Sequence, residues 1–363
     1  MSEAIVASDE DGESNELSST HALPPCPDDV PAEHVALWHV LMRVFGRTPH
    51  PNEVALWGRK LDRGLKATAF LEQLVASRRF VETKFVRTKN PPGHFFSPVV
   101  DPDEVRDYVG RERLAGPDDL AGIAFPLHEM EAFWTGNRDF IAATPFTQER
   151  SPENRYFYGG GPYNYGDAIT LRMMIGHFRP RRVIEIGSGF SSACMLDAAD
   201  HAGLEHFHLT CIEPYPKRLR SVLRDTDWQG RVTLHERGVQ GMPLDDFAAL
   251  EAGDILFIDS THVMKTGSDV HYELFHILPV LKAGVVVHIH DCRFPLEYSD
   301  IQIFQKNYSW NEAYAVRALL MYSTRFKVIF SGSLFARERE SMIREVIPTY
   351  LRNPGSALWL QVR

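Results

Sequence analysis

The chain has 363 residues, of which 44% are hydrophobic and 24% charged. This balance is ordinary for a globular protein and excludes collagen-like, wholly disordered and disulfide-scaffold classes. The length favours two domains, or one large domain with an appendage.

The formal net charge of −9 is concentrated at the N-terminus, because residues 1–33 contain nine acidic residues and no Lys or Arg. The rest of the chain holds 39 acidic and 39 basic residues. A neutral body lacks the positive field that a phosphate backbone requires, so we expect no nucleic-acid partner. Scattered cysteines, and the lack of a leader pattern or a long apolar run, predict a cytoplasmic protein without a membrane span.

The first half of the chain divides into three segments. Residues 1–31 are rich in Ser, Asp, Glu and Pro, which predicts a disordered acidic tail. Residues 32–90 carry apolar residues at helical spacing and predict a small helical module. Residues 91–162 are irregular and are interpreted as a linker or lid region, whose aromatic run at 156–163 suits either a lid over a ligand or core packing.

The helical module resembles a small module of unassigned function found beside bacterial glycan and cell-surface enzymes. The matching residues are Leu37–Leu41, Gly46, Arg47, Pro51, Trp57, Leu61 and Ser77–Phe80. No catalytic group stands out in this segment. Helix packing or self-association is its simplest role, so we expect any homo-oligomer to form through these helices.

Residues 163–363 alternate helical and strand patterns, which predicts an α/β fold with a Rossmann-like, mainly parallel sheet. Seven strands are expected, near residues 182–186, 207–213, 232–236, 255–259, 285–290, 327–330 and 357–361. Ligands of such sheets bind beyond the carboxyl ends of the strands. The polar residues at the strand ends are therefore the candidate functional residues.

The first strand ends in a glycine-rich turn, and the following helix offers free N–H groups to a ligand. The predicted cofactor residues of this turn are Glu185, Gly187, Ser188, Gly189 and Ser191. Nicotinamide-binding folds use a similar turn with a third glycine, whereas this chain has Ser192 there. Glu185 either balances an ammonium group of the bound cofactor or caps the N–H groups of the loop.

Glu213 ends the second strand, where an ionised carboxylate can accept both hydroxyls of a ribose. This feature supports an adenosyl group without choosing between cofactors. After the third strand, Val239 and Gln240 stand where related folds contact the adenine ring, although an ordinary turn explains them equally well.

The fourth strand ends at Asp259 with His262 three residues on, and the fifth ends at His290 and Asp291. His288 and His290 share one face of the fifth strand because side chains alternate along it. Carboxylates and imidazoles should therefore surround one crevice. A neutral imidazole, with an ordinary pKa near ~6.5, can remove a hydroxyl proton at physiological pH. We nominate His262 first and His290 second as the base; the alternative is structural histidines at strand ends.

From about Tyr163 onward the chain resembles class I S-adenosylmethionine-dependent methyltransferases. The branch is that of macrolide-sugar O-methyltransferases and proteins described as cephalosporin-hydroxylase-like. The matching stretches are Val183–Ser192, Cys211–Pro214, Ile258–Gly267, Gly284–Tyr298 and Trp310–Tyr314. The resemblance implies seven strands with the last one reversed, S-adenosylmethionine as cofactor, and Glu185, Gly187, Gly189 and Glu213 as cofactor residues.

In the resembling sugar O-methyltransferases, the positions of Asp259 and His262 serve as metal ligand and base. Their second metal pair is Glu-Asp, whereas this chain has His290-Asp291. Because imidazole weakens a site for magnesium, the set Asp259, His290 and Asp291 leaves magnesium, manganese, zinc and no metal all open.

The combined reading is an S-adenosylmethionine-dependent O-methyltransferase that acts on a hydroxyl of a sugar, a glycan or a glycosylated or small natural product. The catalytic candidates are His262, His290 and Asp259, and Asp259 is also predicted to contact the cofactor. Two alternatives stay open at this point: a nicotinamide-dependent oxidoreductase, and a non-catalytic nucleotide-binding assembly module. Trp310–Tyr314 should open a helix capped by Asn311. The resemblance places this loop, with Phe294, Pro295 and Tyr298, beside the acceptor pocket.

Overall fold

The computed structural model describes residues 30, 32–45, 49, 51–66, 69–70, 73–74, 94, 96–112, 115–163 and 165–363. Its contacts divide the chain into two compact units, residues 1–97 and 98–363. The predicted acidic tail at 1–31 lies outside the described residues apart from Val30. No helix of the described part of the chain is long and apolar enough to cross a membrane.

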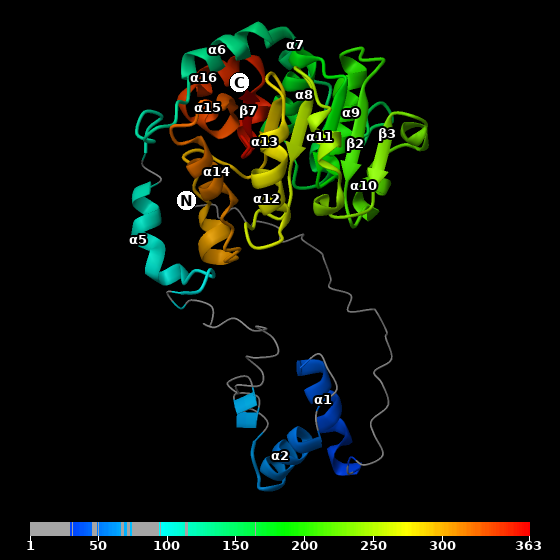
Figure 1. Ribbon diagram of the computed structural model, residues 1–363, viewed down its shortest axis with the longest axis vertical. Helices are drawn as coiled ribbons and strands as arrows, with labels where there is room; N and C mark the ends of the chain where they lie inside the picture. Colours follow the sequence, from blue (N-terminus) through cyan, green and yellow to red (C-terminus); the bar gives the residue numbers. More distant parts are fainter. Residues whose placement is uncertain are drawn as a thin grey trace, which may run out of the picture. The chain divides into compact units, whose positions relative to one another are not determined.

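The first unit contains the helices α1 (Val35–Phe45) and α2 (Pro51–Asp62), and a 3-10 turn, η1 (Ala32–His34), precedes α1 (Figure 1). Apolar residues three and four positions apart give each helix one apolar face. The buried side chains form a small core of their own, made of Leu37, Trp38, Leu41, Val54, Trp57, Phe70 and Leu74.

The second unit is built on a seven-stranded sheet with the order β3-β2-β1-β4-β5-β7-β6. The strands are β1 (Arg182–Ile186), β2 (His208–Ile212), β3 (Val232–His235), β4 (Ile255–Ile258), β5 (Val286–Ile289), β6 (Phe326–Ser331) and β7 (Leu358–Val362). β7 pairs antiparallel with both β5 and β6, and the other pairings are parallel. The predicted Rossmann-like methyltransferase sheet with a reversed last strand is confirmed.

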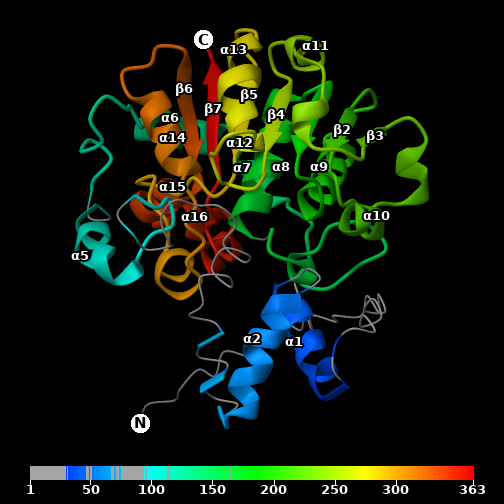
Figure 2. The same cartoon turned by 60° about the horizontal axis from the view of Figure 1, so that its bottom comes forward.

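Helices cover both faces of this sheet (Figures 1 and 2). From β1 to β3 the chain adds strands toward one edge of the sheet, and from β4 to β5 it adds them toward the other edge. Because the crossovers between parallel strands are right-handed, this change of direction places two sets of helices on opposite faces. The first set is α8 (Gly166–Phe178), α9 (Phe190–His201) and α10 (Lys217–Val222). The second set is α11 (Leu244–Ala248), α12 (Asp269–Tyr272), the π-helix η5 (Glu273–Ile277) and α13 (Leu278–Val280).

Further helices precede and follow this core. Before it lie α5 (Pro102–Glu112), α6 (Leu127–Gly136), α7 (Arg138–Ala142) and the 3-10 turn η2 (Tyr158–Gly160). Short turns at η3 (Asp225–Trp228) and η4 (Val239–Gly241) flank β3. After β5 come the π-helix η6 (Ile301–Gln305), α14 (Glu312–Leu320), α15 (Gly332–Glu338), α16 (Glu340–Val346) and η7 (Pro348–Arg352).

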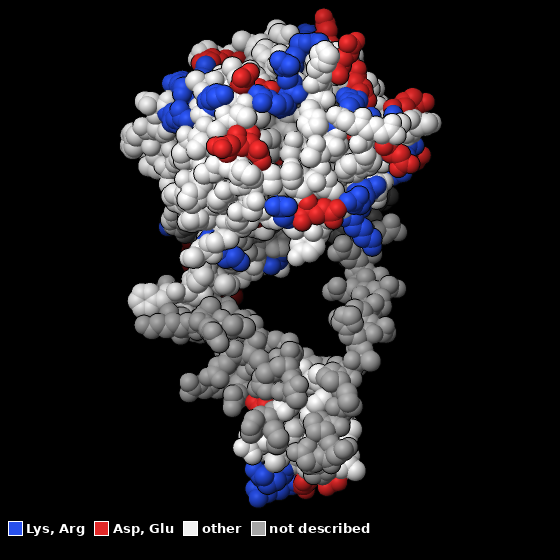
Figure 3. Space-filling view, turned by 45° about the vertical axis from the view of Figure 1, so that its right-hand side comes forward, with Lys and Arg blue, Asp and Glu red and all other residues white. Residues whose placement is uncertain are grey.

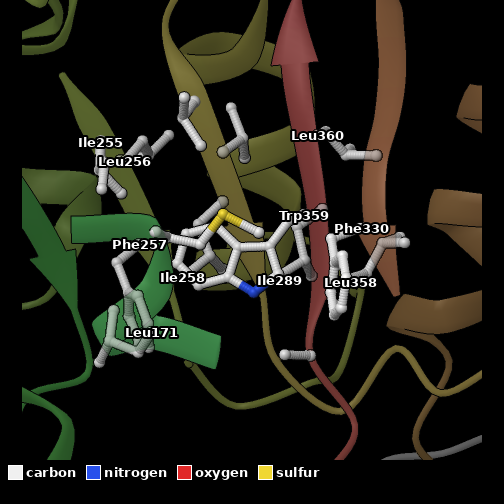
Figure 4. Packing of buried hydrophobic residues seen from close by; sticks show 14 of the residues in the cluster. Leu171, Ile255, Leu256, Phe257, Ile258, Ile289, Phe330, Leu358, Trp359 and Leu360 are labelled. Carbon is white, nitrogen blue, oxygen red and sulfur yellow. The ribbon is translucent and has the colours of Figure 1, made fainter. Parts of the chain in front are cut away.

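The core of the second unit includes the apolar side chains of β4, β5 and β7, which lie close together in Figure 4. The ring of His288 is stacked on Phe257 at 3.8 Å between centroids and lies 4.5 Å from Trp359. Burial lowers the pKa of His288 well below its ordinary value. His288 is therefore a neutral core residue, and its side chain does not line the cavity described below.

The segment before the aromatic run is anchored to the sheet by a buried ionic cluster. The Arg155 guanidinium donates to Asp197 and Asp200 at 2.7 Å, and to Asp227 at 2.8 and 2.5 Å. Tyr156, the next residue, is buried and donates its N–H to Asp197. The run that follows is therefore packed into the core along part of its length.

Charges on the second unit are mixed. Figure 3 shows Lys and Arg side chains interspersed with Asp and Glu on the face that it presents. This local mixture agrees with the formal neutrality of the chain beyond residue 33. That no nucleic acid binds stays a prediction.

Candidate active site

A cavity of about 300 Å³ opens beyond the carboxyl ends of β1 and β4, where the strand order reverses. Such a reversal point separates two loops that leave in opposite directions, so a crevice forms there. Six predicted cofactor residues line the cavity, namely Gly187, Ser188, Gly189, Ser191, Glu213 and Asp259. His290 and Asp291 line it as well. Ile186 of β1 pairs with Ile258 of β4, and Ile258 pairs with Ile289 of β5. The carboxyl ends of β1, β4 and β5 therefore lie side by side.

Gly187 allows the glycine turn to pass close to the backbone at the end of β4. Its φ is +81°, and a Cβ atom there would lie 1.8 Å from the carbonyl oxygen of Asp259. Only glycine fits such a position, because any side chain would collide with fixed backbone. The backbone of the turn can therefore line the cavity directly, which is what a bulky adenosyl ligand requires.

Glu185 lies beneath the turn and does not line the cavity. Its carboxylate accepts hydrogen bonds from the Ser191 hydroxyl, at 2.6 Å, and from the Ser192 hydroxyl. Ser192 Oγ in turn accepts the N–H of Gly189 at 3.0 Å. Burial raises the pKa of Glu185 to about 7, although the serine hydroxyls favour its ionised form. Glu185 is thus linked to the Gly189 N–H through the Ser192 hydroxyl, near the start of α9, and its role toward a cofactor stays a prediction.

Glu213 lines the cavity and is held from behind by two backbone donors. Its Oε2 accepts the Ser188 N–H at 3.1 Å, and its Oε1 accepts the Tyr215 N–H at 2.7 Å. Each oxygen retains lone-pair capacity for a further donor. Val239 and Gln240 do not line this cavity: Val239 is buried, and the Gln240 amide donates to the carbonyl of Gly267 at 3.0 Å.

Five further residues line the cavity, namely Pro162, Tyr163, Phe190, Ser260 and Arg218. Pro162 and Tyr163 belong to the aromatic run for which a lid over a ligand was one of two expectations, whereas reasoning from the sequence missed the other three. Tyr163 ends the aromatic run, whose members Tyr156, Tyr158 and Tyr163 are all buried. The run therefore combines core packing with one wall of the site. The position of Phe190, directly after the glycine turn, was the signal that could have identified it.

At the ends of β4 and β5, two non-glycine residues adopt left-handed backbone conformations: φ is +60° at His262 and +52° at Asp291. Such conformations persist only where surrounding contacts impose them, and they gather at functional sites. Here the contacts bring His262 Nε2 to 3.5 Å from Asp259 Oδ1 and 3.6 Å from Asp291 Oδ2. His262 Nδ1 lies 2.8 Å from Glu312 Oε2, on the first turn of α14.

His262 is a cation in this arrangement. Burial opposes its charge, but the hydrogen bonds with Asp259 and Glu312 outweigh burial and raise the pKa of His262 to about 11. An imidazole with this pKa keeps its proton at physiological pH and cannot accept another. His262 also does not line the cavity, whereas Asp259 and Asp291 do.

His290 differs from His262 in its position and in its hydrogen bonds. It lines the cavity, and its Nδ1 has no hydrogen-bond partner among the described residues. Burial lowers the pKa of His290, but Asp259, Asp167 and Asp291 together raise it overall. Asp167 is held behind the site by the N–H groups of Ser356 and Ala357, both at 3.1 Å.

The predicted metal set does not fit a metal ion as arranged. Within the described part of the chain, no three His, Cys, Asp or Glu side chains are grouped so that they could hold one. The imidazolium of His262 instead bridges the two carboxylates of the set, Asp259 and Asp291.

Asn311 precedes α14 as expected, but its side chain does not cap that helix. Its amide instead joins the His262 loop: Oδ1 accepts the Met264 N–H at 2.6 Å and Nδ2 donates to the Met264 carbonyl at 3.2 Å. The Asn311 N–H donates to the His262 carbonyl. The cap prediction was wrong because a loop distant in sequence competes for this side chain.

Comparisons with known proteins agree with this geometry. A family model described as "Methyltransferase domain" matches residues 184–292. An uncharacterized protein of Archaeoglobus fulgidus is 30% identical over 166 residues, which are 44% of this chain and 73% of that protein. Among solved structures, the SAH-bound methyltransferase PaMTH1 of Podospora anserina is similar at 16% identity and a TM-score of 0.37. That match covers 77% of this chain and all of the other.

A second solved structure is the O-methyltransferase TomG of Streptomyces achromogenes in complex with SAM. It is similar at 13% identity and a TM-score of 0.36, over 66% of this chain and 91% of that one. With its reversed seventh strand, its glycine turn and its matched domain, the chain belongs to the class I S-adenosylmethionine-dependent methyltransferases. The nicotinamide and non-catalytic alternatives are thereby set aside.

Proposed function

We propose that this enzyme transfers the methyl group to a hydroxyl of a sugar, a glycan or a glycosylated or small natural product, with His290 as general base. The observation that carries the proposal is the position of His290. Among the described residues that line the cofactor cavity it is the one imidazole, and it shares that lining with the carboxylates Asp259 and Asp291, whose charges act on it. The resemblance of the chain to sugar O-methyltransferases supports a hydroxyl acceptor.

The methyl donor, when bound, supplies an electrophilic methyl group on a sulfonium. A hydroxyl is a weak nucleophile until its proton is removed, and a positioned base contributes about 10²–10⁴ in rate. His290 would accept that proton in its neutral form. The carboxylates of Asp259 and Asp291 then stabilise the imidazolium that results, as their effect on the pKa of His290 indicates.

His262 has a positioning role in this proposal. Its charge is fixed by Glu312 on one side and shared between Asp259 and Asp291 on the other. A buried cation in that place holds the two carboxylates at the edge of the cavity, since unpaired they would repel each other. This assignment reverses the order in which the sequence ranked the two histidines.

The test uses the full-length protein, a labelled methyl donor and fractionated extract as the source of acceptor, followed by identification of the labelled product. With that acceptor, His290→Ala should lower kcat at least about a hundredfold, while the Kd for S-adenosylhomocysteine stays within a few-fold. Added imidazole should restore part of the rate. His206→Ala, at an exposed histidine outside the cavity, is the matched control. An unchanged kcat in His290→Ala would refute the base assignment.

A divalent ion is not part of the proposal. Dialysis against a chelator should leave the rate unchanged, because the His262 cation already lies beside Asp259 and Asp291. A rate that is lost on chelation and restored by magnesium, manganese or zinc would show that the side chains rearrange around a metal.

A further inference from the structure

A second cavity lies in the same unit, outside the residues that match the methyltransferase family model. Its volume is about 290 Å³, and it lies among α5, η6 and the start of α14. Figures 1 and 2 show α5 beside the segment that leads into α14. Five aromatic side chains and one carboxylate characterise this aromatic pocket: Tyr108, Tyr298, Tyr308, Trp310, Tyr314 and Glu297.

One wall of the aromatic pocket is held in a strained conformation. Asn307 and Ser309 have φ values of +42° and +49°, which non-glycine residues rarely adopt. Hydrogen bonds hold this loop against Val100: Ser309 Oγ accepts its N–H at 3.2 Å, and Asn307 Nδ2 donates to its carbonyl at 3.0 Å. Strain that the surrounding structure enforces is typical of ligand-binding loops, and it pre-forms the wall.

Four of the aromatic rings in the lining pack against each other in pairs. Tyr308 stacks on Trp310 with centroids 4.5 Å apart, and Tyr298 meets Tyr314 edge-on at 5.4 Å. Glu297 is buried, and its Oε1 accepts the Tyr314 hydroxyl at 2.5 Å and the Tyr298 N–H at 2.8 Å. The lining thus combines ring faces with a fixed carboxylate.

The charges of the lining select a neutral ligand. Glu297 disfavours an anion, and Arg317 disfavours a cation, although aromatic cages alone attract cations. Gln302, Asn307 and Ser309 add hydrogen-bonding groups to the apolar walls. A volume near the lower end of small-molecule sites, about 300 Å³, suits a single ring and not a peptide or an oligosaccharide.

The aromatic pocket adjoins the catalytic groups through one side chain. The Trp310 ring lies 4.4 Å from the His262 ring, centroid to centroid. His262 in turn contacts Asp259 and Asp291 in the wall of the cofactor cavity. Trp310 is therefore shared between the aromatic pocket and the layer that borders the cofactor.

We propose that the aromatic pocket binds a neutral, hydroxylated six-membered ring of the methyl acceptor. The ring faces pack on Trp310 and Tyr308, and its hydroxyls bind Glu297 and the polar groups of the loop. This inference rests on the proposed function, because it assigns the acceptor a second point of attachment. A sugar ring and a phenol share this chemistry, and the experiment separates them.

Binding is measured on the full-length protein saturated with S-adenosylhomocysteine, by ligand-observed NMR. The probes are methyl β-glucopyranoside, p-cresol and, as a cationic competitor, tetramethylammonium. A single ring should bind in the millimolar range. Tyr308→Ala and Glu297→Gln should each weaken binding at least fivefold. Tyr322→Ala, which removes an exposed tyrosine outside the aromatic pocket, should leave it unchanged.

Binding of the glucoside alone identifies a sugar acceptor, and binding of the cresol alone a phenol. The inference is overturned if neither ring binds, if tetramethylammonium binds in their place, or if Tyr308→Ala has no effect. These outcomes require no turnover. The failure of this inference is thereby distinguishable from the failure of the proposed function, which appears as an unchanged kcat in His290→Ala while ring binding persists.

Discussion

The two cavities of the catalytic unit have nearly equal volumes, about 300 and 290 Å³, but are built by different means. The cofactor cavity lies at the ends of β1, β2, β4 and β5, and the glycine turn with its short side chains forms part of its lining. The aromatic pocket is lined by large side chains on α5, η6 and α14, outside the sheet. The ends of the strands form a cofactor site that many proteins of one fold can share. Segments added outside the sheet can differ between such proteins, and they determine which second ligand binds.

The largest expected effect comes from the turn that forms the cofactor cavity. Gly187→Ala places a methyl group 1.8 Å from the Asp259 carbonyl oxygen, so the turn must leave β4. We expect a loss of about 4 kcal/mol or more in the free energy of unfolding, together with loss of S-adenosylhomocysteine binding. Denaturant titration and calorimetry measure the two.

Gly203→Ala is the matched control for this change. Its φ is also positive, at +62°, but a Cβ atom there meets nothing within 4 Å. It should therefore cost only the left-handed backbone penalty, roughly 1–2 kcal/mol, and leave the Kd unchanged. Equal effects of the two substitutions would show that the contact with Asp259 is not what requires glycine.

The contrast between the cavities also explains what the sequence could predict. The glycine turn, the acid at Glu213 and the polar ends of β4 and β5 follow from local rules, because strand periodicity and loop position fix where they lie. Six of the predicted cofactor residues line one cavity for this reason. The reversed β7 followed from the resemblance, not from a pattern within the strand.

Properties that depend on packing between distant segments were not accessible in the same way. The charge of His262 depends on Asp259, three residues earlier, but also on Glu312, 50 residues later. The aromatic pocket requires Val100 to meet Ser309, 209 residues apart. The many aromatic residues between Tyr298 and Tyr314 are apparent in the sequence. The sequence pattern does not predict, however, which of them line the aromatic pocket together.

The second effect concerns the support behind the cofactor cavity. Arg155→Met leaves Asp197 and Asp227 buried without their cation. Removing one partner of such a pair costs about 3–5 kcal/mol, so the unfolding midpoint should fall steeply. Arg220→Met breaks an exposed pair with Glu236 and should change stability by less than about 1 kcal/mol. If both variants unfold alike, the buried cluster does not support the aromatic run.

The third effect is a pH dependence at Glu185. Burial raises its pKa in the folded protein from 4.5 to about 7, so folding favours the protonated form. The stability that the proton contributes is present below pH 4.5 and is lost as pH rises through about 7. Glu185→Gln has no such proton to lose. The free energy of unfolding of the variant should therefore gain roughly 2–3 kcal/mol relative to the wild type between pH 4.5 and 8.

Denaturant titrations of both proteins at several pH values measure this difference. A difference that stays flat would mean that Glu185 is ionised throughout. Calorimetry on Glu185→Gln tests the other hypothesis, that Glu185 balances the charge of the cofactor. In that case the affinity for S-adenosylmethionine should fall more than the affinity for S-adenosylhomocysteine, because the latter lacks the sulfonium charge.

The smallest expected effect is a change in cofactor binding that leaves ligand binding in the aromatic pocket unaltered. Glu213→Gln keeps the size of the side chain but replaces one acceptor oxygen with a donor, so one ribose hydroxyl loses its partner. We expect about a fivefold weaker binding of S-adenosylhomocysteine, which corresponds to about 1 kcal/mol, with ring binding in the aromatic pocket unchanged. Glu236→Gln, at an exposed carboxylate outside both cavities, is the control. Tyr308→Ala should give the reverse pattern, and a variant that weakened both ligands equally would mean that the two cavities act as one site.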